Sequence, residues 1–183
     1  MHYGKSLVHG KAECQKIIDI ANTIGFEESP VRSGASESMR KDIRNNSRAI
    51  VTLSNEFIEN LERALVSRDI IPMVYKGMKY SRLNEVFRVY KYTDGQYFKP
   101  HKDGSIDLGD EETRLTVLMY LNTCDSGATY IYPYGVSQPW AKSKTRCERG
   151  TVIVFDHDLW HEGEPVVAET KYVLRTDVFY FKN

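Results

Sequence analysis

The chain has 183 residues, a length that fits one domain with a single sizeable core. Lysine plus arginine and aspartate plus glutamate number 25 each, so the formal net charge is zero and no overall field favours nucleic acid or an anionic membrane. Apolar residues make up 41% and charged residues 27%, which is ordinary for a soluble globular protein.

Cysteine spacing and hydropathy favour a cytoplasmic protein. Cys14, Cys124 and Cys147 are widely spaced and form no CxxC pair, so the sequence predicts neither a disulfide framework nor a zinc knuckle. No run approaches the roughly 18 apolar residues of a membrane span, and we expect no membrane partner. The N-terminal residues lack the apolar core of a secretory leader.

The first third of the chain reads as helical. Apolar residues recur from Cys14 to Ile24 at three- and four-residue spacing, and Gly25 is a natural stop. A second helix is expected from about Ser54, a plausible N-cap, to about Ser67. The polar stretch between them, residues 27–48, predicts a long loop, and loops of this length are often functional lids or are disordered.

From Glu85 onward the period changes from helical to extended. The expected strands are rich in β-branched and aromatic residues and cover residues 86–92, 115–121, 128–132, 151–155 and 171–180. Gly-containing turns separate them. Many short strands after a helical start predict a mainly β fold with flanking helices (α+β): a double-stranded β-helix, jelly-roll or cupin-like, at residues 85–181, supported by residues 1–84.

A candidate metal site combines His101, Asp103 and the later His161. Residues i and i+2 of an extended backbone point to the same side, so His101 and Asp103 can reach one ion. Two imidazoles and one carboxylate form the facial triad of non-haem Fe(II) oxygenases. That triad leaves three positions open, and an α-keto acid can fill two of them while O2 takes the third. We therefore expect these residues to be both the metal ligands and the catalytic centre.

A 2-oxoglutarate co-substrate would also need a cation for its distal carboxylate. Lys171 begins the last long strand and shares a face with Val173, Arg175 and Asp177, so two cations can point inward. Tyr120 is a candidate hydroxyl donor to the same carboxylate, and Tyr92 could line the metal pocket. The expected co-substrate residues are therefore Lys171, Tyr120, Tyr92 and Arg175, with core packing as the alternative for each tyrosine.

Several motifs in fixed order resemble the prolyl 4-hydroxylase-type 2-oxoglutarate oxygenases. The segment 90–104, with His101-Lys102-Asp103, resembles their iron-binding segment. Residues 114–122, Ser126-Gly127-Ala128-Thr129, residues 161–166 and Lys171-Tyr172 continue the likeness, which covers about half the chain, residues 85–181. The resemblance implies a double-stranded β-helix that uses Fe(II), 2-oxoglutarate and O2, often with ascorbate as reductant.

The expected reaction is hydroxylation of a C–H bond, in a prolyl or other side chain of a peptide or protein. Arg175 and Asp177 depart from the better-known animal members, so the substrate class is not inherited. A free amino acid, a small metabolite or a nucleic acid is the alternative, and a non-catalytic metal-binding module is a third. The candidate substrate residues are Arg44, Asn45, Asn46 and Arg48 in the polar stretch and Trp140 in the loop 133–145.

A rival zinc site is suggested by His157 and His161, which have the i, i+4 spacing of a metalloprotease motif. That motif needs glutamate after the first histidine and a helix that brings both imidazoles to one face. Here the residue is Asp158, a strand precedes the pair, and Gly163 follows closely. The sequence therefore favours the iron site.

Overall fold

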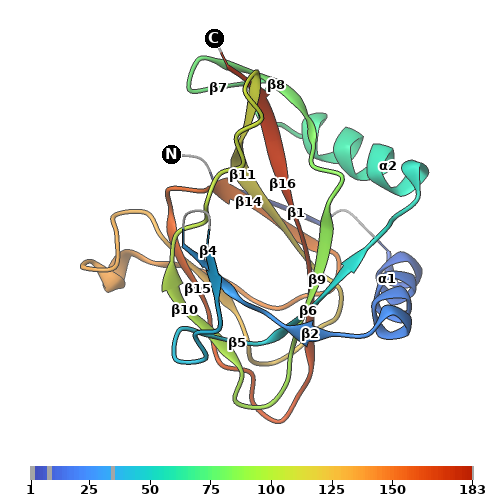
Figure 1. The fold of residues 1–183 in the computed structure, drawn as a ribbon, viewed down its shortest axis with the longest axis vertical. Coiled ribbons are helices and arrows are strands. Elements are labelled where there is room, and N and C mark those ends of the chain that lie inside the picture. The colour runs from blue at the N-terminus through green and yellow to red at the C-terminus, as the bar shows by residue number, and fades with distance from the viewer. Residues whose placement is uncertain (1–2, 8–9, 34–35, 183) are drawn as a thin grey trace.

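The computed structural model describes the backbone of residues 3–7, 10–33 and 36–182, and the side chains of residues 10–30 and 38–182. Two antiparallel sheets form the body of the molecule, and two helices lie on the side of the larger sheet away from the smaller one (Figure 1). This architecture confirms the predicted mainly β fold with a double-stranded β-helix core and flanking helices. Neither described helix is long and apolar enough to cross a membrane.

The larger sheet has the strand order β1-β14-β11-β16-β9-β6-β2, while β8 pairs with β16 and β7 pairs with β8. The bounds of these strands are β1 Tyr3–Leu7, β2 Glu27–Glu28, β6 Ser47–Val51, β7 Val74–Tyr75, β8 Met78–Leu83, β9 Phe87–Tyr92, β11 Glu111–Tyr120, β14 Thr151–Asp156 and β16 Lys171–Phe181. The predicted strands at residues 86–92, 115–121, 151–155 and 171–180 correspond to β9, β11, β14 and β16.

The smaller sheet has the order β13-β12-β15-β10-β5. Its strands are β5 Arg44–Asn45, β10 Tyr97–His101, β12 Thr129–Tyr132, β13 Ser143–Thr145 and β15 Trp160–Gly163. A separate hairpin pairs β3 Val31–Ser33 with β4 Ser36–Ser38, and a short 3-10 helix, η1, spans Pro139–Ala141. The predicted strand at residues 128–132 corresponds to β12.

Both predicted helices are present. Helix α1, Lys11–Ile24, ends at Gly25, which has a positive φ of 90° and donates its backbone N–H to Ala21. Helix α2, Asn55–Val66, begins after Ser54, whose side chain accepts a hydrogen bond from the Phe57 N–H. Their apolar stripes join the main hydrophobic core on the larger sheet.

The alternation of side chains along β16 separates the core from the site. Leu174, Val178 and Tyr180 face the helices and belong to the main core. Lys171 and Arg175 lie on the opposite face and line a cavity between the sheets. One strand therefore serves both the core and the site, because its two faces carry different residue types.

The polar stretch 27–48 is not the single long loop that its composition predicts. Its described parts pair as strands: β2 with β6, β3 with β4, and β5 with β10. Residues before 85 thus add strands as well as helices to the fold, and β5 carries the stretch to the edge of the smaller sheet. The side chains of residues 31–37 lie outside the description.

Candidate active site

The register between β10 and β15 brings His101 and His161 together. Phe98 pairs with Gly163 and His101 pairs with His161, so the register shifts between the two pairs. This irregularity contains Pro100, which has no N–H to give to a ladder. As directly opposed residues of an antiparallel pair, the two histidines place their ring centroids 4.1 Å apart.

Asp103 completes the cluster two residues after His101. Its Oδ1 lies 3.8 Å from His101 Nε2, and its Oδ2 lies 3.5 Å from His161 Nε2. The Thr116 hydroxyl donates a 2.6 Å hydrogen bond to Asp103 Oδ2, and the Asp103 N–H donates to the carbonyl of His157. Ligand atoms of the three residues all lie within 4.8 Å of one another, so the predicted triad is assembled in space.

The orientation of both imidazoles suits a divalent metal. His101 Nδ1 lies 2.8 Å from the Lys99 carbonyl, and His161 Nδ1 lies 3.0 Å from the Leu159 carbonyl. A proton on each Nδ1 satisfies that carbonyl and leaves the Nε2 lone pair for a metal. Burial lowers the pKa of both imidazoles, so they are neutral at pH 7, as ligation requires. Two nitrogens and one carboxylate fit Fe(II).

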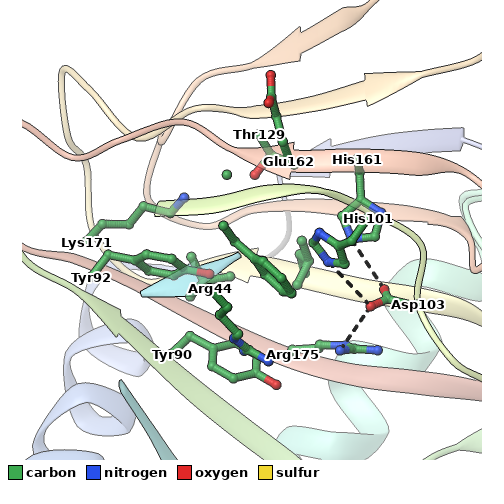
Figure 2. A pocket seen from close by; sticks show the side chains of 14 residues that line it. Arg44, Tyr90, Tyr92, His101, Asp103, Thr129, His161, Glu162, Lys171 and Arg175 are labelled. Atoms are coloured by element: carbon green, nitrogen blue, oxygen red, sulfur yellow. Dashed lines mark ion pairs between the residues drawn. The ribbon is translucent and has the colours of Figure 1, made fainter. Parts of the chain in front are cut away.

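Asp103 is held ionised by its surroundings, and Figure 2 shows its ion pairs with His101, His161 and Arg175. Arg175 Nη1 lies 3.2 Å from Asp103 Oδ1, and Arg175 Nη2 lies 3.1 Å from Asp177 Oδ1. Burial alone would raise the pKa of Asp103, but Arg175 and the nearby imidazoles outweigh it and hold that pKa well below its usual range. Arg175, one of the expected co-substrate residues, is therefore brought to the metal cluster rather than to Lys171, which lies four residues earlier on the strand.

Lys171 lines the same inner cavity as the triad, and Figure 2 shows its ammonium pointing inward from the opposite end. The side chain is 2% exposed, and Nζ donates a 2.6 Å hydrogen bond to the Gly127 carbonyl. Among the described side chains, no carboxylate lies within ion-pair distance of it. Burial lowers the pKa of Lys171 to about 8. A buried ammonium without a counter-ion is suited to an anionic ligand.

Both predicted tyrosines lie beside Lys171. Its Nζ is 4.8 Å from the Tyr92 ring centroid and 5.6 Å from that of Tyr120. Tyr92 lines the inner cavity, and burial raises its pKa to about 12. The Tyr120 hydroxyl donates to Thr129 Oγ1 at 2.7 Å, and Thr129 lines the cavity. Tyr120 thus stands behind Thr129 in this arrangement.

The predicted substrate residues divide into two groups. Arg44 is buried and lines both the inner cavity and a larger outer cavity, and Arg48 lines the outer one. Asn46 is buried and accepts a 2.9 Å hydrogen bond from Arg44 Nε, while Asn45 pairs with Tyr97 in the smaller sheet. Trp140 is 79% exposed on η1 and lines neither cavity.

Three residues of the site were given no role on the basis of the sequence. Thr116 binds Asp103 from the inner face of β11, and strand alternation could have indicated it. Gly127 has a φ of 72°, and a Cβ there would lie 2.9 Å from Val166 Cγ2 and 3.0 Å from Lys171 Cδ, so the turn needs glycine for conformation and for space. Arg88 lines the outer cavity, which no local pattern indicates.

The rival zinc motif is not formed. His161 lies on β15 and His157 lies in the turn before it, so no helix presents the two imidazoles on one face. His157 Nε2 lies 3.4 Å from Asp177 Oδ1, whereas His161 faces Asp103. The two histidines therefore contact two different carboxylates, those of Asp177 and Asp103.

Comparison with known proteins agrees with this geometry. The model of the 2OG-Fe(II) oxygenase superfamily matches residues 87–177, which contain the whole triad and Lys171. No curated protein matches the chain in sequence. The chain belongs to the 2OG-Fe(II) oxygenase superfamily. It is accordingly a 2-oxoglutarate-dependent dioxygenase, a class that uses Fe(II), 2-oxoglutarate and O2, typically with ascorbate as reductant.

Solved structures with a similar fold include several prolyl hydroxylases. The viral collagen prolyl hydroxylase of Paramecium Bursaria Chlorella virus-1, in its 2OG complex, has 20% identity and a TM-score of 0.67 over 98% of this chain and 96% of that one. A Trichoplax adhaerens prolyl hydroxylase in complex with a hypoxia inducible factor peptide fragment has 18% identity and a TM-score of 0.73 over 98% and 83%. A Pseudomonas putida prolyl-4-hydroxylase has 14% identity and a TM-score of 0.65 over 99% and 93%.

Proposed function

We propose that this enzyme hydroxylates a C–H bond of a prolyl or other side chain in a peptide or protein. The observation that carries the proposal is the placement of the His101–Asp103–His161 cluster between two cavities. The inner cavity ends at Lys171, and the outer cavity opens beside His101 and Asp103. The metal cluster can therefore face a co-substrate on one side and a substrate on the other.

Residues in and behind the inner cavity have distinct roles in the proposed chemistry. His101, Asp103 and His161 hold the iron, and Lys171 binds the distal carboxylate of 2-oxoglutarate with Tyr92 and Tyr120 beside it. When bound, iron and 2-oxoglutarate activate O2, so that one oxygen atom enters the substrate and 2-oxoglutarate leaves as succinate and CO2. Arg175 and Thr116 keep the Asp103 carboxylate ionised and oriented, and apolar walls from Leu118 and Val173 exclude water.

A peptide substrate is supported by the outer cavity and by the relatives in fold. The cavity has a volume of about 380 Å³, which suits one side chain and its neighbouring backbone. The Trichoplax adhaerens enzyme has been solved with a peptide fragment bound, and its fold covers 98% of this chain. A free amino acid or small metabolite would also fit this volume, and it is the second candidate.

Mass spectrometry of a cell lysate treated with purified enzyme tests the proposal. The lysate is supplied with Fe(II), ascorbate and 2-oxoglutarate, and peptides and metabolites are searched for the gain of one oxygen atom. We expect a peptide to gain oxygen with wild type and not with His101→Ala, which lacks a metal ligand. Gain of oxygen by free metabolites alone would contradict the peptide substrate, and no gain anywhere would contradict hydroxylation.

A further inference from the structure

The wall of the outer cavity is unusually cationic for a chain without net charge. Its charged lining residues are Arg44, Arg48, Arg88, Lys102, Asp103, Arg175 and Asp177. Both carboxylates are already bound by Arg175, at 3.2 Å and 3.1 Å. Arg48 has an ion pair with Glu27 at 3.1 Å. Three further titratable groups face this wall: Tyr90 and His101, which line the cavity, and His157, whose Nε2 lies 3.4 Å from Asp177 Oδ1. The remaining charges, those of Arg44, Arg88 and Lys102, are all positive.

Arg88 is the most informative of these cations. It lies on β9, directly opposite Arg175 of β16, with its side chain on the cavity side of the sheet. Opposed like charges on neighbouring strands destabilise a sheet unless an anion is shared between them. Arg175 has two carboxylates of its own, whereas Arg88 is partly buried and its side chain has no hydrogen-bond or ion-pair partner among residues 10–30 and 38–182.

Arg44 adds a second cation that lacks a carboxylate. Arg44 is 8% exposed, and its guanidinium carbon lies 4.4 Å from the Tyr90 ring centroid and 4.5 Å from that of Phe98. Its hydrogen bonds go to Asn46 Oδ1 and the Pro30 carbonyl, which are both neutral acceptors. Stacking on two rings holds the charge in place without neutralising it. Arg88 and Arg44 therefore present uncompensated charge to the same cavity.

We propose that the substrate of this enzyme is an acidic peptide, in which the carboxylate of an aspartate or glutamate side chain binds Arg88 in the outer cavity. The proposal rests on the peptide-hydroxylase function proposed above and names its substrate class. The planar guanidinium takes a carboxylate through two parallel hydrogen bonds, which fixes the orientation of the peptide. Because Arg88 opposes Arg175, and Arg175 contacts Asp103, the bound carboxylate lies close to the metal cluster.

The surroundings favour a carboxylate side chain over the phosphates of a nucleic acid. A nucleic acid needs a positive groove that follows several phosphates along a strand. Here the cations surround one cavity of about 380 Å³, and the whole chain carries 25 basic and 25 acidic residues. A single acidic group on a short segment matches that shape.

Matched peptide pools test the inference. Three pools of random synthetic peptides differ only in the residues beside the centre, which are glutamate, glutamine or lysine, and oxygen gain is measured by mass spectrometry. We expect wild type to modify the glutamate pool at least about tenfold faster than the glutamine pool. Arg88→Gln removes this preference, and Arg88→Glu shifts it toward the lysine pool. Arg63→Gln, on the exposed face of α2, is the matched control and retains the wild-type preference.

The outcomes separate the two proposals. Equal modification of the glutamate and glutamine pools by wild type, or an acidic preference retained by Arg88→Gln, overturns the acidic substrate and leaves the peptide hydroxylase standing. Because Arg88→Glu reverses a preference rather than abolishing a rate, partial misfolding cannot produce its result. Oxygen gain by free metabolites and by no peptide pool overturns the proposed function, and the acidic peptide with it.

Discussion

Arg175 and Asp103 form an ion pair of 3.2 Å at the centre of the site, and the same guanidinium reaches Asp177 at 3.1 Å. Asp103 lies in the loop after β10, whereas Asp177 lies on strand β16. One cation therefore holds a metal-ligand residue against the larger sheet. Burial would lower the pKa of Arg175, but the two carboxylates outweigh it and raise that pKa.

Replacing Arg175 should destabilise the folded protein even when no metal is bound. Arg175→Met leaves two buried carboxylates without their cation, and we expect a loss of about 3 to 5 kcal/mol in the free energy of unfolding. Urea denaturation of the metal-free protein measures it. Arg175→Lys keeps the positive charge but not the planar guanidinium that contacts both carboxylates, and its loss in the free energy of unfolding should be smaller. A loss below about 1 kcal/mol for Arg175→Met would contradict the role of this pair.

Thr116→Val removes the 2.6 Å hydrogen bond to Asp103 Oδ2 with little change in side-chain volume. Partners that orient a metal ligand typically contribute 10- to 100-fold to metal affinity, so we expect Fe(II) to bind about 10-fold more weakly. Equilibrium dialysis under anaerobic conditions measures this affinity. Thr23→Val, on the exposed face of α1, is the control and should bind iron like wild type.

Lys171→Met should raise the KM for 2-oxoglutarate by about 100-fold, because a buried carboxylate then has no cation. Succinate formation at varied 2-oxoglutarate concentration gives the KM. Lys79→Met, an exposed lysine on β8, serves as the matched control and should not change it. A KM that is equal in the two variants would show that Lys171 does not bind the co-substrate.

The affinity for 2-oxoglutarate should fall as the pH rises above about 8, the pKa to which burial lowers Lys171. Below that value the ammonium is formed before the ligand arrives. Above it, binding must take up a proton, because the bound carboxylate raises the pKa of Lys171 again. The dissociation constant then rises by about tenfold per pH unit. Calorimetric titration from pH 7 to 10 tests this, and Lys171→Arg, which stays charged, should abolish the dependence.

Gly127→Ala should cost more stability than Gly135→Ala. Both glycines have positive φ, 72° and 84°, so each substitution pays the same backbone penalty of about 1 kcal/mol. Only at Gly127 does the new Cβ meet neighbours, Val166 and Lys171, whereas nothing lies within 4 Å at Gly135. Thermal unfolding of the two variants measures the difference. Equal losses of stability in the two variants would show that the turn at Gly127 accommodates the added Cβ without displacing Lys171.

The helices and strands that could be predicted from the sequence are those with a local residue pattern. The repeat from Cys14 to Ile24 located α1, and β-branched runs located β9, β11, β14 and β16. The strands β5, β10 and β15 escaped it because Arg44–Asn45 is short, β10 contains Pro100, and Trp160–Gly163 has no alternation. These strands exist because they pair with one another, and such pairing is a long-range property.

The same distinction applies to the site. His101, Asp103 and His161 could be selected by residue type and order, and the structure brings them together. The contacts of Arg175 with Asp103, and the cavity position of Arg88, depend on the register of β16 with β9 and β11. Register follows from the packed sheet rather than from any one segment, so no local pattern predicts these relationships.

Iron-dependent conversion of 2-oxoglutarate to succinate, compared between wild type and Asp103→Ala, tests the central claim most directly. We predict that wild type forms succinate only when Fe(II) is supplied, and that the rate of Asp103→Ala, which lacks the carboxylate ligand, is at least about 100-fold lower. Full succinate formation by Asp103→Ala would contradict the assignment of the metal site.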